Sequence, residues 1–299
     1  MLGNVQRRVR RLRRVCAERL AETVVATLAR NGRVRKNLVR TLFDRHLDPS
    51  CRVAVEFADH RFLVDPKDTQ IGYKLMSGRA WQRAELERAV AWLEQEGRLR
   101  SGGVFLDIGA NIGTQTVYAL LDGAFSRAVA IEAEPANYAL LERNVEINGL
   151  TGRVALVRCA ASRLPGVARL RLNRSNAGGH RIGWEKQRRP TPAIEVPADT
   201  VDRILRRIAV APAEVTLAWI DVEGHELAVL EGMGELLATC PPLVLEYAGS
   251  LHGPDGADRL RQLLAGRYQR VVDLGVGHAV AVPLADYDPG RAFRDLLIW

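Results

Sequence analysis

Several features are scarce in this 299-residue sequence, and each scarcity excludes a class of protein. The four cysteines are scattered, with no CxxC pair and no metal-ligand spacing, so reduced thiols and a cytoplasmic location are expected. No run of 18 apolar residues exists, so no membrane span is expected. Residues 1–31 begin with charge but lack an apolar h-region, which argues against a secretory signal.

Net positive charge is confined to the N-terminus. Residues 1–40 hold 12 of the 43 Lys and Arg but two of the 35 Asp and Glu, giving +10, whereas the other 259 residues sum to −2. The main body therefore lacks the excess charge of a nucleic-acid-binding protein. Residues 4–30 combine Arg with apolar residues at helical spacing, which predicts a basic amphipathic helix. Two interpretations stay open for it: contact with an anionic surface or acidic partner, or a solvated helix packed on its own body or on a second subunit.

The sequence predicts three successive parts. Residues 1–40 form the basic helical N-terminus. Residues 41–100 form a small α+β cap, with a hairpin that turns near Asp59 and a helix over residues 79–99. Residues 101–299 form the main domain.

Within the main domain, short apolar strands alternate with helical segments. This alternation predicts an α/β fold with a doubly wound, mainly parallel sheet. Residues 173–192 show no periodicity, which predicts a long surface loop. Strands are expected at residues 104–106, 128–132, 154–157, 167–172, 215–220 and 243–245, helices at 114–121, 135–148, 199–208 and 256–266, and a closing antiparallel pair at 270–274 and 279–283.

Residues 104–113 form an apolar strand followed by a glycine turn that opens a helix. Gly109 and Gly113 bracket the turn, where a side chain would keep the backbone from approaching a ligand. Dinucleotide-binding turns read G-x-G-x-x-G, and their middle glycine lets backbone N–H groups reach a pyrophosphate. Here Asn111 stands between the glycines, and Asp107 comes just before them. A carboxylate at that position would repel a pyrophosphate and attract an ammonium group.

Acidic residues stand at four expected strand ends: Asp107, Glu132, Asp221 and Glu246. Ligands of open α/β sheets bind outside the carboxyl ends of the strands. Because an unpartnered buried carboxylate is costly, these groups are expected to be exposed in a cleft or paired. Glu132 has the spacing of an acid that binds both hydroxyls of a ribose. A nucleoside with an ammonium group and no phosphate fits this set, and S-adenosylmethionine is such a ligand.

Three motifs carry a family resemblance: residues 107–113, residues 132–135 with Asn144 and Asn148, and the Ile-Asp-Val-Glu-Gly-His-Glu segment at 220–226. Together they resemble the FkbM family of class I S-adenosylmethionine-dependent methyltransferases. The similarity covers about residues 100–250 and includes Asn-Ala-Gly-Gly at 176–179. It implies a seven-stranded sheet with a reversed last strand. It also implies O-methylation of a sugar, glycan or natural-product hydroxyl, so the expected partner is a small-molecule or glycan acceptor.

The same resemblance implies a set of cofactor-binding residues. Glu132 would bind the ribose hydroxyls, and Ala160, within residues 159–162, would lie beside the adenine. Asp221 is a further candidate for cofactor contact. The residues implied around the methionine part are Asp107, Gly109, Asn111 and Gly113.

Two positions depart from the family pattern. Trp219 stands where the family often has Lys before the Ile-Asp-Val-Glu-Gly segment. Gln82 follows Trp81 where the family often has Glu after an aromatic residue. Both departures bear on the identity of the acceptor more than on cofactor use.

Methyl transfer to a hydroxyl is an in-line displacement that usually requires a base for the acceptor proton. His225 is the first candidate, because imidazole titrates near neutrality and the neighbouring carboxylates would raise its pKa. Asp221 and Glu246 are the other catalytic candidates. In the long loop, His180 is a second histidine candidate and Trp184 could stack on an acceptor.

Other readings of the same residues stay open. Asp221, Glu223 and Glu246 could together hold a divalent cation, although no metal is expected. As an RNA methyltransferase, the protein could bind RNA through its Arg-rich N-terminus. The near-neutral body and the lack of an Asn/Asp-Pro-Pro-Tyr/Phe motif after residue 220 argue against nucleic acid. A non-catalytic cofactor-binding scaffold is the third reading, and the intact acids at the strand ends argue against it.

Overall fold

The computed structural model describes most of the chain after residue 50. The basic helix expected over residues 4–30 and Trp184 lie outside the described residues. Within them, no helix is long and apolar enough to cross a membrane. The described residues are 51–173, 176–183, 192–253, 255–276, 279–288, 290 and 292–299.

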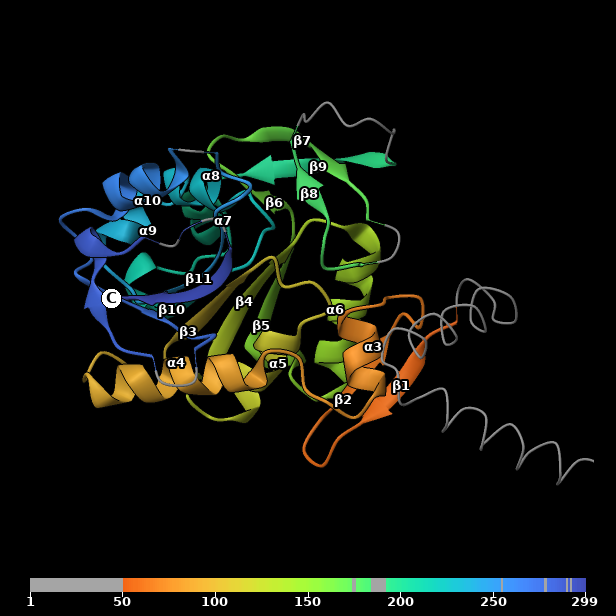
Figure 1. Ribbon diagram of the computed structural model, residues 1–299. Helices are drawn as coiled ribbons and strands as arrows, with labels where there is room; N and C mark the ends of the chain where they lie inside the picture. The colour runs from red at the N-terminus through yellow and green to blue at the C-terminus, as the bar shows by residue number, and fades with distance from the viewer. Residues whose placement is uncertain are drawn as a thin grey trace, which may run out of the picture.

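An eight-stranded sheet forms the centre of the molecule (Figure 1). Its strands are β3 (Val104–Ile108), β4 (Arg127–Glu132), β5 (Val154–Arg158), β10 (Val215–Ile220), β11 (Leu243–Ala248), β12 (Arg270–Asp273), β13 (Val282–Pro283) and β14 (Phe293–Ile298). They follow the order β13-β12-β14-β11-β10-β3-β4-β5, and β14 runs antiparallel to both of its neighbours. The α/β prediction with a mainly parallel sheet and a reversed last strand is confirmed, and the two-residue β13 adds an eighth strand to the expected seven.

Helices cover both faces of this sheet (Figure 1). Each face has its own cluster of buried apolar side chains, because the sheet separates the two helical layers. On one face lie α4 (Arg83–Gln95), α5 (Thr114–Leu121) and α6 (Pro135–Ile147). On the other lie α7 (Val201–Arg207), α8 (Glu226–Glu231), α9 (Gly234–Ala238) and α10 (Gly256–Leu264).

The segment expected as a cap forms a hairpin and a short helix against α6 (Figure 1). The hairpin pairs β1 (Val53–Glu56) with β2 (Arg61–Val64) and turns around Asp59, as expected, and α3 spans Ile71–Met76. Phe62 of β2 is fully buried in the same apolar cluster as Phe105 of β3. These residues therefore share a hydrophobic core with the main sheet.

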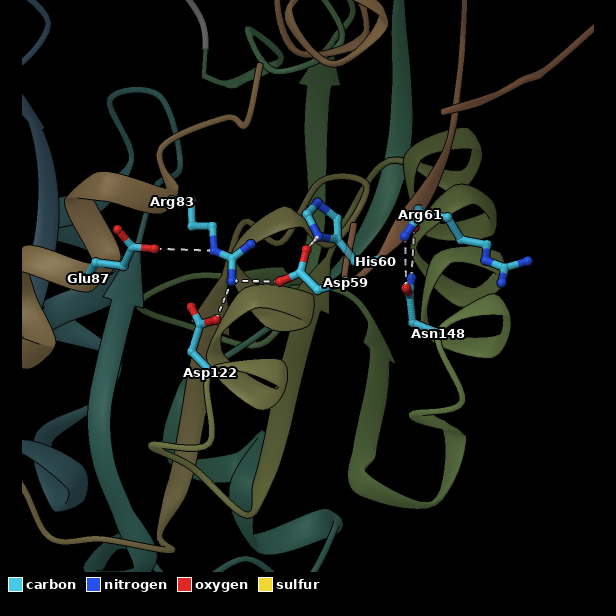
Figure 2. Close-up of polar contacts among 7 residues, drawn as sticks. All are labelled: Asp59, His60, Arg61, Arg83, Glu87, Asp122 and Asn148. Carbon is cyan, nitrogen blue, oxygen red and sulfur yellow. Dashed lines mark hydrogen bonds and ion pairs between the residues drawn. The ribbon is translucent and has the colours of Figure 1, made fainter. Parts of the chain in front are cut away.

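Two asparagines of α6 bind β2 through its backbone. Asn144 accepts the N–H of Leu63 at 2.7 Å and donates to the carbonyl of Leu63 at 3.2 Å. One helical turn later, Asn148 accepts the N–H of Arg61 at 3.0 Å and donates to its carbonyl at 2.8 Å (Figure 2). Asn144 also donates to the carbonyl of Ile112 at 2.8 Å, so it joins the hairpin to the glycine turn after β3.

Removing the two amides should have unequal effects. Asn144→Ala is expected to lower the free energy of unfolding by about 2–4 kcal/mol, because Asn144 is fully buried and its loss leaves polar backbone groups without partners. Asn148→Ala is the matched control, since it removes the same kind of contact at a more exposed position and should cost about 1 kcal/mol. Urea unfolding measures both. Equal losses would contradict the link to the buried glycine turn.

An ion-pair network fixes the tip of the hairpin (Figure 2). Arg83 of α4 contacts Asp59 at 2.8 Å, Glu87 at 3.3 Å and also Asp122 at the end of α5. The hydrogen bond from Arg83 holds the pKa of Asp59 at about 2. Asp59 also contacts Nδ1 of His60 at 2.5 Å. The tip is thus bound to two helices that also pack against each other.

A second, four-stranded sheet stands above the carboxyl ends of the main strands (Figure 1). Its strands are β6 (Ala160–Ala161), β7 (Gly166–Arg171), β8 (Arg181–Ile182) and β9 (Ala193–Asp199). The half-exposed strand expected at 167–172 is confirmed as β7, whereas the prediction of an aperiodic loop at 173–192 was partly wrong, because this segment contains β8. The helix expected at 199–208 begins later, since β9 occupies the residues before it.

Candidate active site

A pocket opens at the carboxyl ends of β3, β4 and β10, between them and the four-stranded sheet. It contains about 520 Å³ of empty space, part of it open to solvent. Backbone from the glycine turn forms one wall, and small side chains after β4 and β5 form another. Of the residues predicted from the sequence, it is lined by Gly109, Asn111, Glu132, Ala160, His180, Asp221 and Glu223.

The glycine turn fits closely against the segment after β10. Gly109 has φ of 87°, and a Cβ on it would lie 1.8 Å from the carbonyl oxygen of Asp221. Only glycine permits this approach. Gly113 has the same φ but does not line the pocket; a Cβ there would meet Leu141 at 2.6 Å, so this glycine allows α5 to pack against α6.

Both carboxylate oxygens of Glu132 accept a backbone hydrogen bond at the pocket. Its Oε2 accepts the N–H of Asn111 at 2.8 Å, and its Oε1 accepts the N–H of Glu134 at 2.7 Å. A carboxylate has about four lone-pair positions, so roughly two remain for a ligand. Burial raises the pKa of Glu132 to about 7, and the two backbone N–H groups oppose that rise.

Asp107 lies beneath the turn rather than in the pocket. Its carboxylate accepts from the hydroxyl of Thr116 in α5 at 2.5 Å, and burial raises its pKa to about 7. It is buried and not exposed in the cleft, and its hydrogen-bond partner is the Thr116 hydroxyl. The register explains its direction: Asp107 is the neighbour of Trp219 across the parallel β3–β10 pair, and side chains at matching positions share a face. Both belong to the α4–α6 side.

Hydrogen bonds of the Ala177 backbone hold residues 176–179 over the glycine turn. The carbonyl of Ala177 accepts from the side-chain amides of Asn111 at 3.0 Å and Asn137 at 2.9 Å. Its N–H donates to Asp68 at 3.3 Å. The Asn111 side chain is therefore bound to protein. Residues 176–179 were part of the family resemblance, but Asn137 and Asp68 were not singled out from the sequence, because the contact joins segments that are distant along the chain.

Asp221 and Glu246 form a carboxyl pair, in agreement with the expectation that such groups would be paired. Burial and the nearby Glu246 raise the pKa of Asp221 well above its usual value. A hydrogen bond joins the two groups, so the pair shares one proton. Burial raises the pKa of Glu246 to about 7, and Asp295 faces it across the β11–β14 pair. Among the described residues, no group of three or more His, Cys, Asp or Glu could hold a metal ion.

Neither histidine is placed as a ready base. His225 is not among the residues that line the pocket, and its Nε2 lies 3.0 Å from the hydroxyl of Ser162. Its pKa was expected to rise, but burial lowers it more strongly than Glu226 raises it. His180 lines the pocket, yet its Nδ1 accepts the N–H of Asn173 at 3.0 Å and burial lowers its pKa to about 4. Neutral His180 therefore carries its hydrogen on Nε2.

Glu223 lies in the segment after β10 that also contains the base candidate His225. It lines the pocket, and its side chain is 17% exposed. One carboxylate oxygen accepts from Arg181 at 3.2 Å. Burial raises its pKa, and Arg181 partly opposes the rise. Its φ of 52° is a strained backbone conformation for a residue with a side chain, as is common at functional sites.

The two departures from the family pattern lie outside the pocket lining. Trp219 is buried in the apolar cluster on the α4–α6 face. Gln82 begins α4 and accepts a hydrogen bond from Gln115 at 3.1 Å. Both side chains are held by the protein core beneath the glycine turn.

A family model described as the methyltransferase FkbM domain matches residues 107–270 of this chain, which is more than half of its length. The matched span contains the glycine turn, Glu132 and the whole of the second sheet. The strand order and the reversed β14 form the Rossmann-like fold of class I methyltransferases. No match is found among the curated proteins.

Two solved structures are similar to this chain at low sequence identity. An FkbM methyltransferase from Methylobacillus flagellatus matches with a TM-score of 0.43 and 16% identity, over 76% of this chain and 58% of its own. The tRNA methyltransferase TrmK of B. subtilis matches with a TM-score of 0.40 and 15% identity, over 72% of this chain and 64% of its own. The match thus spans less than two thirds of either structure.

Proposed function

Because this chain belongs to the FkbM methyltransferase family, we propose that it transfers a methyl group from S-adenosylmethionine to a hydroxyl of a sugar, glycan or natural-product acceptor. The observation that carries the proposal is the arrangement of Glu132. Its two oxygens are each oriented by one backbone N–H, and each keeps room for one further hydrogen bond. Two adjacent ribose hydroxyls present the matching pair of donors.

The rest of the pocket fits the same cofactor. Ala133, Cys159 and Ala160 provide small, uncharged surfaces of the kind that a flat adenine ring requires. Asp221 and Glu223 line the region beyond the glycine turn. Asp221 shares one proton with Glu246, so the pair keeps one negative charge, which favours a positively charged sulfur and ammonium group. The same charge would repel a pyrophosphate, which disfavours a dinucleotide in this pocket.

When bound, S-adenosylmethionine supplies an electrophilic methyl group on a positively charged sulfur. The chain must then hold the acceptor oxygen in line and receive its proton. Glu223 is the group that suits this task in our proposal, because one of its oxygens is fixed by Arg181 and the other is not involved in that contact. His225 then has a positioning role through Ser162.

Cofactor binding tests the central part of the proposal. S-adenosylmethionine and S-adenosylhomocysteine are each expected to raise the melting temperature by several degrees, since a ligand at 100 times its Kd adds about 2.7 kcal/mol to stability. The pyrophosphate-bearing control is NAD⁺, which should not displace bound S-adenosylhomocysteine from the pocket. No shift with either sulfur compound, or displacement of S-adenosylhomocysteine by NAD⁺ at equal concentration, would overturn the assignment.

The chemistry of transfer needs a separate measurement. The full chain with methyl-labelled S-adenosylmethionine is expected to label members of a panel of sugars, glycans and hydroxylated natural products. An O-methyl ether keeps its label in mild alkali, whereas a methyl ester loses it. Label found only in alkali-labile product, or only in RNA offered in parallel, would contradict hydroxyl methylation of small molecules and glycans.

A further inference from the structure

A second cavity lies at the amino edge of the main sheet, opposite the pocket. Three connections meet there: α4 to β3, α9 to β11, and α10 to β12. The cavity contains about 1390 Å³ of empty space, part of it open to solvent. We call it the amino-edge cavity; its charged lining residues are Arg98, Arg100, Arg267, Arg270 and Glu96.

The arginines of the amino-edge cavity are not neutralised by acids. Arg100 donates to the carbonyl of Val215 and Arg270 to the carbonyl of Ala281, each at 3.1 Å. These contacts fix the two guanidinium groups and leave their remaining N–H groups for other partners. For Arg98 and Arg267, the described part of the chain supplies no side-chain hydrogen bond or ion pair. By contrast, the buried acid Asp199 forms ion pairs with two arginines, Arg203 and Arg207.

Helix ends account for part of this positive charge. The C-termini of α4, α9 and α10 point to this edge, and each carries roughly half a negative charge. Among the side chains that line the cavity, four are arginines and one, Glu96, is an acid. Positive side-chain charge therefore predominates in this concave site. Arginine forks bind phosphate oxygens in pairs, and a phosphate chain concentrates more charge in a small volume than a carboxylate.

We propose that the amino-edge cavity binds a ligand with two or more adjacent phosphate groups. Arg98 and Arg267, which have no side-chain partner among the described residues, come from two separate connections, so they can contact such a ligand from two sides. The intervening strands β3, β10 and β11 have five or six residues, which is a length of about 17–20 Å. The phosphates thus bind away from the methyl-transfer pocket, and the site is independent of the proposed function.

Tripolyphosphate titrated into the full chain at 150 mM NaCl tests the proposal by calorimetry, with inorganic phosphate as the weaker probe. A saturable site is expected, and Arg98→Gln/Arg267→Gln should weaken it at least tenfold. The matched control is Arg79→Gln/Arg163→Gln, which removes two exposed arginines outside the cavity and changes the net charge equally. It should stay within twofold of the unmodified chain. Thermal unfolding and the S-adenosylhomocysteine shift verify that both variants fold.

Three outcomes would overturn the proposal. Equal weakening in both double variants would mean that tripolyphosphate responds to overall charge, including the Arg-rich residues 1–40. Unchanged affinity in the Arg98→Gln/Arg267→Gln variant would place the binding elsewhere. Absence of a saturable site at millimolar tripolyphosphate would leave the arginines as partners of the helix ends alone.

Discussion

Glu132→Ala is expected to weaken binding of S-adenosylhomocysteine more than 100-fold. The substitution removes the acceptor of two hydrogen bonds to a charged group, which are worth about 1.5–3 kcal/mol each. Calorimetric titration measures the loss directly. Glu142→Gln, on the exposed side of α6, is the control and should bind as the unmodified chain does. Unchanged affinity in Glu132→Ala would remove the observation on which the proposed function rests.

The same carboxyl group predicts how binding depends on pH. The pKa of Glu132 is about 7 in the free protein, and the ribose hydroxyls require the charged form as their acceptor. Binding is therefore expected to weaken as the pH falls through 7, by roughly tenfold between pH 8 and pH 6. Glu132→Ala should show no such dependence. A flat profile in the unmodified chain would contradict the assignment of Glu132 to the hydroxyls.

Asp107→Asn is expected to stabilise the ligand-free protein at pH 8. The pKa of Asp107 is about 7 in the folded state against 3.8 for the ordinary group, because burial disfavours the charged form. Its favourable contribution to folding is complete below pH 4 and is lost as the pH rises through 7. The difference amounts to about 4 kcal/mol above pH 7. Asparagine avoids the buried charge and can still accept the Thr116 hydroxyl.

Urea unfolding at pH 5 and pH 8 checks this expectation. The gain in unfolding free energy from Asp107→Asn should be larger at pH 8 than at pH 5. Asp199→Asn is the matched control, since Asp199 is also buried at a strand end but is paired with Arg203 at 2.8 Å and Arg207 at 3.1 Å. That variant should lose stability at pH 8. A loss of stability in both variants would mean that charged Asp107 has an unrecognised partner.

The parts of the fold that follow from local patterns were predictable from the sequence. β3, its glycine turn and α5 are consecutive, and the apolar run and glycines that define them are adjacent along the chain. β14 was not placed from its own residues, because Arg294 and Asp295 interrupt its apolar pattern and its partners are distant in sequence. β9 was missed for a similar reason, since Glu195 and Pro197 obscure its alternation.

The candidate site was also predictable only in part. Parallel strands bring their carboxyl ends together, so the acids at the strand ends could be grouped from the sequence alone. Which face each side chain takes depends on register, and this sent Asp107 toward α5 while Glu132 lines the pocket. The lowered pKa of His225 depends on burial, and the hydrogen bonds of Ala177 depend on contacts between distant segments. No local sequence pattern contains either.

The contact between α6 and β2 has a consequence for how this protein can vary and be redesigned. Asn144 forms hydrogen bonds with the backbone N–H and carbonyl of Leu63, and Asn148 with those of Arg61. Every residue except proline has both of these backbone groups. β2 is therefore recognised by its register and its outward side chains are free to change, whereas the tip of the hairpin keeps Asp59 for its contact with Arg83. A different hairpin with apolar residues at positions 62 and 64 could be grafted onto the same two asparagines, which would change the rim beside the glycine turn without redesigning the sheet.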